Sequence, residues 1–208
     1  MSAVESAATV LVDGARELAI PLDGALVDAL LRFLGLLEQW NRTFNLVGPA
    51  SIEEWAVRHL LDSLAILRRI DLVGRLLDVG SGAGLPGVPL ALARPSLDVS
   101  LNEPNRKRQS FLRRSIAELG LTNARVEGER LATLSGRYDF LVARAVWSPD
   151  ALAVAAGPHL VEGGGLIVLT SAPPTPELAG GFLREICDSF VLPTLGAPRS
   201  VSLYRRAS

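Results

Sequence analysis

Residues 76–84, with the sequence LLDVGSGAG, join a short apolar run to a turn that is rich in glycine. Glycine lets the backbone turn sharply and lets a ligand approach the main chain closely. The prolines that follow, Pro86 and Pro89, suit the first turn of a helix, where a missing N–H costs little. The segment is therefore typical of a buried strand that turns into a helix N-terminus, which favours an α/β fold.

Short apolar runs alternate with helical stretches from residue 75 onward. A helix is expected at Asn105–Leu119, with Gly120 as its C-terminal cap. Such alternation predicts βαβ units and a mostly parallel, doubly wound sheet that is covered on both faces. We expect the strands at Arg75–Val79, Asp98–Asn102, Ala124–Glu127, Asp139–Ala143 and Gly165–Thr170.

The C-terminal part of the chain departs from this alternation. We predict a helix near Glu177–Ser189, followed by an antiparallel hairpin built from the segments around Val191 and Val201–Tyr204.

The first part of the chain has the pattern of two amphipathic helices. Large apolar residues recur at spacings of three and four from Leu22 to Trp40. Ser51 and Glu54 have the spacing of a capping box, which predicts the start of a second helix with Trp55 on its apolar face. We therefore expect Trp40 and Trp55 to pack in the core rather than to stack on bases. We interpret the chain as one domain, 1–208, in which 1–72 form a helical cap and 73–208 the α/β core.

Charge and composition exclude several classes of protein. The 208 residues carry 21 Lys and Arg against 22 Asp and Glu, a formal net charge of −1, so the chain does not coat nucleic acid through charge alone. Hydrophobic residues make up 49% of the chain, which excludes disorder. One local segment is basic, and it is either a solvated helix face or a strip that binds phosphates. Its cations are Arg106, Lys107, Arg108, Arg113 and Arg114.

The cysteine count and the N-terminus predict the compartment. Cys187 is the only cysteine, which excludes an internal disulfide and a Cys-rich zinc site and favours a reducing compartment. Neither a secretory signal nor an apolar run of membrane-spanning length is evident. We therefore expect a cytoplasmic protein that binds neither membrane nor metal, and we expect a monomer.

An acidic residue, Glu103, ends the strand that follows the glycine turn, where its carboxylate can accept hydrogen bonds from the hydroxyls of a ribose. The dinucleotide fingerprint G-x-G-x-x-G is not met, because Leu85 occupies the position of the last glycine. Asp78 immediately before the turn is also typical of methyltransferases. S-adenosylmethionine is therefore favoured over a nicotinamide cofactor, although a tight turn that binds no ligand remains an alternative.

Three segments resemble a known family: residues 40–46 (WNRTFNL), 58–64 (RHLLDSL) and 78–91 (DVGSGAGLPGVPLA). They are similar to the glucose-inhibited division protein B family, the small-subunit rRNA methyltransferases G, which methylate guanine N7 in 16S rRNA with S-adenosylmethionine. The resemblance implies a Rossmann-like S-adenosylmethionine-dependent methyltransferase fold. With the glycine-turn pattern, it implies cofactor-binding residues at Asp78, Gly80, Gly82, Gly84, Leu85, Glu103, Arg130, Leu131 and Arg144.

The same resemblance implies 16S rRNA, or the small ribosomal subunit, as the partner. Matching positions place Asn45, Arg58 and His59 beside the mouth of the cofactor site. Together with Arg106, Lys107, Arg108 and Arg113, these are our candidate RNA-binding residues. Asp62 has the spacing of a helix ion pair with Arg58. No residue is assigned as a catalytic acid or base, because N7 of guanine carries a lone pair and no proton.

The chain departs from the family pattern at three places. Glu129-Arg130-Leu131 stands where Arg-Ala-Glu is usual, and Pro104 replaces a serine after Glu103. Thr170-Ser171 replaces a Lys-Gly pair after the fifth strand, which removes a cation. The alternatives are a nicotinamide-dependent oxidoreductase, a non-catalytic RNA-binding protein, and a methyltransferase that acts on another acceptor.

Overall fold

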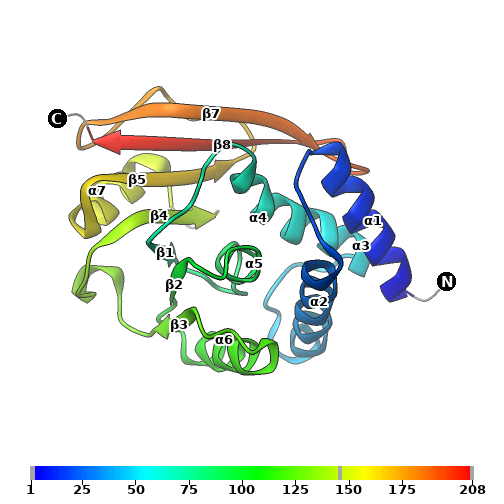
Figure 1. Ribbon diagram of the computed structural model, residues 1–208. Helices are drawn as coiled ribbons and strands as arrows, with labels where there is room; N and C mark the ends of the chain where they lie inside the picture. The colour runs from blue at the N-terminus through cyan, green and yellow to red at the C-terminus, as the bar shows by residue number, and fades with distance from the viewer. Residues whose placement is uncertain (1–2, 145–146, 207–208) are drawn as a thin grey trace.

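The computed structural model describes residues 3–144 and 147–206. Its centre is one sheet with the strand order β3-β2-β1-β4-β5-β8-β7-β6 (Figure 1). Strands β1 to β5 are parallel, and β8, β7 and β6 continue the sheet in antiparallel pairing. The strands are β1 (Arg75–Val79), β2 (Asp98–Asn102), β3 (Ala124–Glu127), β4 (Tyr138–Arg144), β5 (Leu160–Thr170), β6 (Glu177–Leu178), β7 (Phe182–Leu192) and β8 (Ala197–Arg206).

Helices lie before and between these strands, and Figure 1 shows α6 beside β3 at one edge of the sheet, with β7 and β8 at the other. The α-helices are α1 (Ala3–Glu17), α2 (Gly24–Phe44), α3 (Ile52–Trp55), α4 (Asp62–Leu64), α5 (Gly87–Ala93), α6 (Arg106–Leu119) and α7 (Pro149–Ala156). The π-helix η1 (Ala56–Leu61) lies between α3 and α4, and η2 (Ala65–Arg68), η3 (Leu131–Thr133) and η4 (Gly157–His159) are short 3₁₀ turns.

Both faces of the sheet are covered, as the doubly wound prediction requires. Successive side chains of a strand point to opposite faces. Leu76 of β1 packs into the core that contains α1, α2, α5 and α6, whereas Leu77 packs into the core that contains α7. Leu11 of α1 lies in the same hydrophobic core as Leu76 of β1, so the N-terminal helices and the sheet share a core.

The parallel strands follow the sequence prediction closely. The bounds of β1, β2 and β3 are those expected, β4 gains one residue at each end, and β5 begins earlier, at Leu160. The helix predicted at Asn105–Leu119 begins one residue later, at Arg106, and Asn105 is its N-cap. The predicted C-terminal cap is confirmed, and Gly120 has the left-handed conformation (φ 65°). The capping box of Ser51 and Glu54 is also confirmed.

The predicted helix near Glu177–Ser189 is wrong, because this segment forms β6 and most of β7. Phe182, Asp188, Phe190 and Leu192 are buried while the residues between them are largely exposed, a strand pattern with a period of two. Pairing with β8 fixes this conformation. The predicted C-terminal antiparallel hairpin is confirmed, and it is longer than expected.

Helix α1 was not predicted. Its buried side chains include Ala7, Leu11 and Ala15, and alanine gives only a weak hydrophobic signal. The interruption of the second predicted helix by η1 was also unforeseen. Within the described residues, no helix combines the length and the apolarity that crossing a membrane requires.

Candidate functional site

Two cavities adjoin at the carboxyl ends of the parallel strands, where ligands bind in open α/β sheets. The larger, of about 620 Å³, lies between the glycine turn, η1 and the ends of β4 and β5. The smaller, of about 470 Å³, lies between the ends of β1 and β2 and the segment around η3. Gly80 and Arg108 line both cavities, so one ligand can extend from one cavity into the other.

The glycine turn is held to the neighbouring strand by hydrogen bonds. The Ser81 N–H donates to the carbonyl oxygen of Asn102 (2.9 Å), and the Gly82 N–H donates to Oε2 of Glu103 (3.0 Å). A Cβ at Gly84 would lie 2.7 Å from Cγ2 of Val88, so only glycine allows the turn to pack this closely on α5. These contacts hold the turn against β2 and α5.

Asp78 lies beneath the turn and is fully buried. Its Oδ2 accepts a hydrogen bond from the Gly87 N–H at the start of α5 (3.0 Å), while Oδ1 has no hydrogen-bond partner among the described residues. Burial raises the pKa of this carboxyl to about 7, although the Gly87 hydrogen bond opposes the rise. Asp78 lines neither cavity, so its contact is with the protein.

Asp78 should make stability depend on pH. Its pKa rises from 3.8 to about 7 on folding, so between these values the folded protein binds more protons than the unfolded chain. The free energy of unfolding should then fall as pH rises from about 4 to 7, by at most about 1.4 kcal/mol per unit from this group. In the Asp78→Asn variant, the part of this pH dependence that comes from Asp78 should be absent. Urea titrations between about pH 4 and 7, which give the free energy of unfolding, test this.

An Asp71→Asn variant is the matched control, because Asp71 is an exposed carboxylate before β1. It should keep the pH dependence of the wild type. Identical pH dependence in wild type and Asp78→Asn would contradict the raised pKa.

The smaller cavity has a fixed carboxylate and apolar walls. Glu103 is 3% exposed, and its Oε1 accepts a hydrogen bond from the Asn105 N–H (2.8 Å), in addition to the bond from Gly82. Val79, Leu131 and the half-exposed ring of Trp147 supply apolar walls. A carboxylate oxygen can accept more than one hydrogen bond, so Glu103 still has capacity for hydroxyl donors. This combination suits a nucleoside, with the base between apolar walls.

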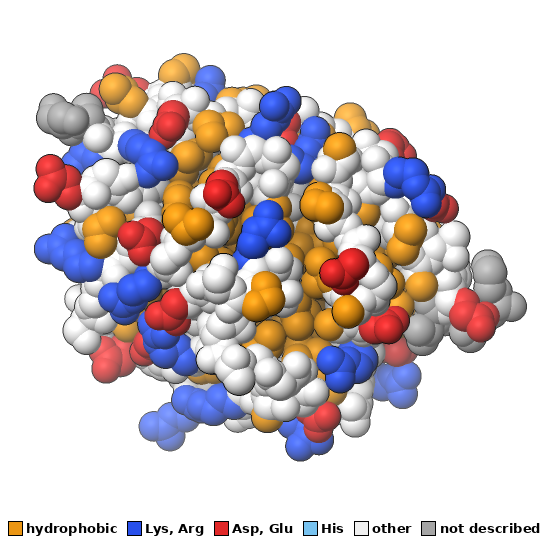
Figure 2. Space-filling view, in the orientation of Figure 1, with side chains coloured by type: hydrophobic (Ala, Val, Ile, Leu, Met, Phe, Trp, Pro, Cys, Tyr) orange, Lys and Arg blue, Asp and Glu red, His pale blue; other side chains and the backbone are white. Residues whose placement is uncertain are grey.

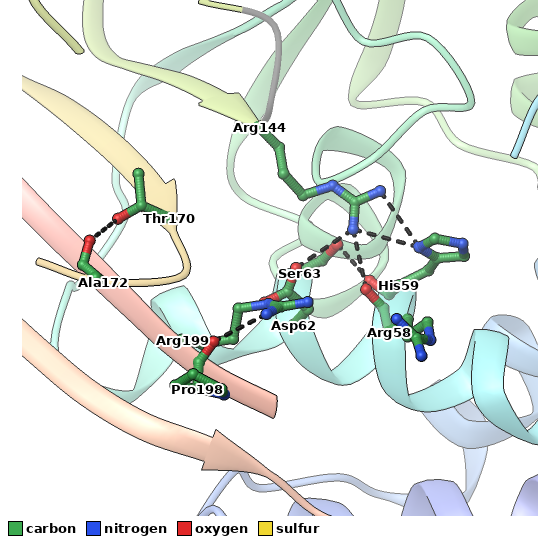
Figure 3. A network of polar contacts seen from close by, with 9 residues as sticks. All are labelled: Arg58, His59, Asp62, Ser63, Arg144, Thr170, Ala172, Pro198 and Arg199. Atoms are coloured by element: carbon green, nitrogen blue, oxygen red, sulfur yellow. Dashed lines mark hydrogen bonds and ion pairs between the residues drawn. The ribbon is translucent and has the colours of Figure 1, made fainter. Parts of the chain in front are cut away.

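The larger cavity contains a network of charged groups around the buried carboxylate of Asp62 (Figure 3). Nη1 of Arg144, at the end of β4, donates to the carbonyl oxygen of Arg58 (3.0 Å) and to Oδ2 of Asp62 (3.3 Å). Nε of Arg199 on β8 lies 3.2 Å from Oδ1 of Asp62, forming an ion pair. One carboxylate from the helical region therefore holds two arginines from different strands.

His59 is neutral in this network. Both Nη atoms of Arg144 lie 3.3 Å from Nδ1 of His59, and because arginine cannot accept, Nδ1 is the acceptor. Burial and the Arg144 charge lower the pKa of His59 to about 3. Burial raises the pKa of the Asp62 carboxyl, against the opposing effect of Arg144 and Arg199. The cavity thus combines a neutral imidazole with guanidinium donors.

Some of the predicted site residues line one or both cavities, and the others line neither. Those that line the larger cavity are Arg58, His59, Gly80, Gly82, Leu85, Arg108 and Arg144, and those that line the smaller are Gly80, Glu103, Arg108, Arg130 and Leu131. The remaining predicted residues line neither cavity and are Asn45, Asp78, Gly84, Arg106, Lys107 and Arg113.

Asn45 caps α2 with a left-handed backbone (φ 48°), next to Leu46 and Val47, which do line the larger cavity. The expected pair of Arg58 with Asp62 is wrong. Arg58 pairs instead with Glu54 (3.5 Å), because Asp62 is buried between Arg144 and Arg199.

Sequence reasoning missed Arg199 and Trp147. Arg199 lines the larger cavity together with Thr170 and Ser171, so β8 brings a cation to the place where the sequence after the fifth strand lacks one. The sequence does not indicate that Arg199 lies near Thr170 and Ser171, because only the antiparallel pairing of β5 with β8 brings them together. An aromatic residue shortly after Arg144 was the only signal for Trp147. In the described part of the chain, no group of three metal-ligating side chains lies together.

Solved structures show the fold of this chain. The S-adenosylmethionine-dependent methyltransferase SibL aligns over 88% of this chain and 76% of its own, with 20% identity and a TM-score of 0.55. A variant of MtNAS in complex with S-adenosylmethionine aligns over 88% of this chain and 77% of its own, with 19% identity and a TM-score of 0.55. The fold is therefore the Rossmann-like fold of S-adenosylmethionine-dependent methyltransferases, as predicted.

Sequence comparison identifies the family. A protein named ribosomal RNA small subunit methyltransferase G from Xylella fastidiosa (strain M23) is 45% identical over 192 residues, which cover 90% of each chain. One of the same name from Stenotrophomonas maltophilia (strain K279a) is 45% identical over 174 residues, covering 79% of this chain and 80% of its own. The family described as rRNA small subunit methyltransferase G matches residues 27–186. The chain belongs to the rRNA small subunit methyltransferase G family.

Proposed function

We propose that this protein transfers the methyl group of S-adenosylmethionine to N7 of a guanine in the 16S rRNA of the small ribosomal subunit. The observation that carries the proposal is the pair of adjoining cavities, one with a carboxylate between apolar walls and the other rich in guanidinium groups. Family membership supports the cofactor and the rRNA substrate. Family membership does not favour the alternatives, which are a nicotinamide-dependent oxidoreductase, a non-catalytic RNA-binding protein and a methyltransferase that acts on another acceptor.

The smaller cavity fits the nucleoside part of S-adenosylmethionine. In this proposal Glu103 accepts hydrogen bonds from the ribose hydroxyls, and Leu131 and Trp147, which line the same cavity, pack against the base. Gly80 lets the ligand pass the backbone into the larger cavity, while Asp78 and Gly84 act indirectly by holding the turn. When bound, S-adenosylmethionine supplies an electrophilic methyl group on a positively charged sulfur.

The larger cavity suits an acceptor that needs no general base. Guanine N7 has a free lone pair, and transfer of a methyl group to it releases no proton. His59, whose pKa is about 3, and Asp62, which is held by two arginines, then serve to orient groups rather than to remove protons. Orientation alone can lower a barrier by roughly 7–11 kcal/mol in favourable cases. Arg58, Arg144 and Arg199 offer donors to a guanine oxygen or to phosphates.

Cations gather on the exposed side of α6, and Figure 2 shows Lys and Arg side chains along the edge of the molecule where this helix lies. Arg106, Lys107 and Arg113 are exposed there, close to Arg108 at the cavities. We interpret this strip as a contact for RNA phosphates. It supplies affinity and little sequence selectivity.

Reversing three of these charges tests the strip. The variant Arg106→Glu, Lys107→Glu, Arg113→Glu should bind 16S rRNA at least tenfold more weakly, because phosphate contacts are lost. The slope of log affinity against log salt should become shallower by about two. Affinity for S-adenosylhomocysteine should not change in calorimetry, and Arg16→Glu on α1 serves as a control. Loss of cofactor affinity would show that the strip is structural.

Methyl transfer tests the proposed function directly. Labelled S-adenosylmethionine is incubated with the protein and small ribosomal subunits, or free 16S rRNA, that lack native guanine-N7 methylation. We expect label in 16S rRNA, recovered as 7-methylguanosine after digestion. Cofactor binding without transfer to either substrate would contradict the proposal and indicate another acceptor.

The remaining inferences follow from this proposal. A protein that modifies rRNA works where ribosomal subunits are assembled, so we infer a cytoplasmic location. Because both cavities are built from one chain, we infer that the monomer is sufficient for activity.

A further inference from the structure

Two aromatic rings form an open surface at the C-terminal end of α2. The ring centroids of Trp40 and Phe44 lie 5.2 Å apart with an interplanar angle of 31°. Trp40 also packs on the buried Phe111 of α6, with centroids 5.7 Å apart, so it is held in place from below. Phe44 has no such cover and is 40% exposed. We name Trp40 and Phe44 the aromatic ledge.

The ledge borders a hollow of about 390 Å³ that also has polar and basic walls, formed by Gln39, Thr43 and Arg114. Arg114 of α6 lies one helical turn after Phe111, and Lys107 lies one turn before it on the same face. Seven residues of helix separate these two cations by about 10 Å along the axis. Arg114 also forms an ion pair with Glu118, one turn further along α6. The ledge is therefore a partly exposed aromatic surface beside two cations, one of which is paired with a carboxylate.

The ledge is close along the chain to residues that line the larger cavity. Leu46 and Val47, which line that cavity, follow Phe44 by two and three residues. The Val47 N–H donates to Oδ1 of Asn41 (2.8 Å), which holds this loop against the end of α2. On the other side, α6 carries Arg108 at the cavities and Arg114 at the hollow. An RNA strand that enters the cavity can thus reach the ledge along α6.

We propose that the aromatic ledge stacks an unpaired base of the rRNA, near the guanine that enters the larger cavity. The inference rests on the proposed function, because it takes the RNA as the substrate. Every base has an aromatic face, so a ledge of this kind binds a base through stacking while neighbouring cations bind its phosphates. An apolar protein segment fits less well, because covering Phe44 would also remove the water around Arg114 and Lys107.

Three variants separate stacking from bulk and from charge. Phe44→Leu keeps an apolar side chain but removes the ring, and it should weaken binding of unmethylated 16S rRNA or small subunits by about tenfold. The salt dependence of binding should stay that of the wild type, because stacking releases no counterions. Phe44→Tyr should restore affinity. Arg114→Gln should instead make the salt slope shallower by about one.

Two controls accompany these measurements. Leu183→Ala removes another exposed apolar side chain, on β7, and should leave RNA affinity unchanged. Affinity for S-adenosylhomocysteine should be the same in all variants, because the ledge lines neither cavity.

The outcomes distinguish the ledge from the methylation proposal. If the wild type forms 7-methylguanosine and Phe44→Leu binds RNA as tightly as the wild type, the ledge proposal is wrong and the methylation proposal stands. If the wild type binds rRNA but transfers no methyl group, methylation is contradicted and the affinity of Phe44→Leu still decides the ledge. If the wild type does not bind rRNA, both proposals fail.

Discussion

Replacement of Gly80 by leucine should abolish cofactor binding, with affinity for S-adenosylhomocysteine reduced at least a hundredfold in calorimetry. Gly80 has φ 69°, a left-handed conformation that costs a residue with a side chain about 1–2 kcal/mol. It also lines both cavities, so a leucine side chain there would take up the space through which one ligand extends. Methyl transfer should be lost with binding.

Gly196→Leu is the matched control for this variant. Gly196 also has a left-handed backbone (φ 62°), and a Cβ built there meets no atom within 4 Å. It lies in the turn between β7 and β8 and lines neither cavity. The control should be destabilised by a similar amount and should bind cofactor normally. Full cofactor affinity in Gly80→Leu would show that the cofactor binds elsewhere.

Replacement of Asp62 by alanine should have the second large effect. Removing one partner of a fully buried ion pair costs about 3–5 kcal/mol, and this is the upper limit here because Arg144 and Arg199 line the larger cavity and are partly exposed. Here both Arg144 and Arg199 would lose their carboxylate. We expect urea titrations to show a loss of stability of up to this limit, and we expect kcat/KM for rRNA to fall more than a hundredfold.

Asp188→Ala separates the two effects. Asp188 on β7 is also buried between two arginines, with Arg68 Nε at 3.2 Å and Arg69 Nε at 4.0 Å. It lines neither cavity, so its loss should destabilise the protein and leave kcat/KM near the wild-type value at temperatures where the variant is folded. Equal activity in the two variants would mean that Asp62 has only a structural role.

The parallel half of the sheet was predictable because its signals are local. A buried strand, a glycine turn and a capped helix each show themselves within about ten residues, so β1, β2, β3 and α6 were placed correctly. The β7 segment was misassigned for the opposite reason. Arg184, Glu185 and Ile186 resemble part of a helix, and only pairing with β8 makes them a strand.

In the candidate site, too, the features that depend on neighbouring residues were predictable and those that depend on distant residues were not. The glycine turn and Glu103 were predictable, since their roles follow from neighbouring residues. The partners of Asp62 were not, because local spacing pointed to Arg58 while the fold brings Arg144 and Arg199 to it. Burial explains the pKa of Asp78 and His59, and burial is a property of the whole fold.

The ion pair of Asp62 with Arg199 has a consequence for the order in which the protein matures. It joins a helical turn in the first third of the chain to a strand that begins at Ala197, so it cannot form until almost the whole chain is present. A nascent chain that ends after β5 lacks Arg199, and therefore lacks part of the wall of the larger cavity. The enzyme therefore becomes competent only after β8 is synthesised and paired.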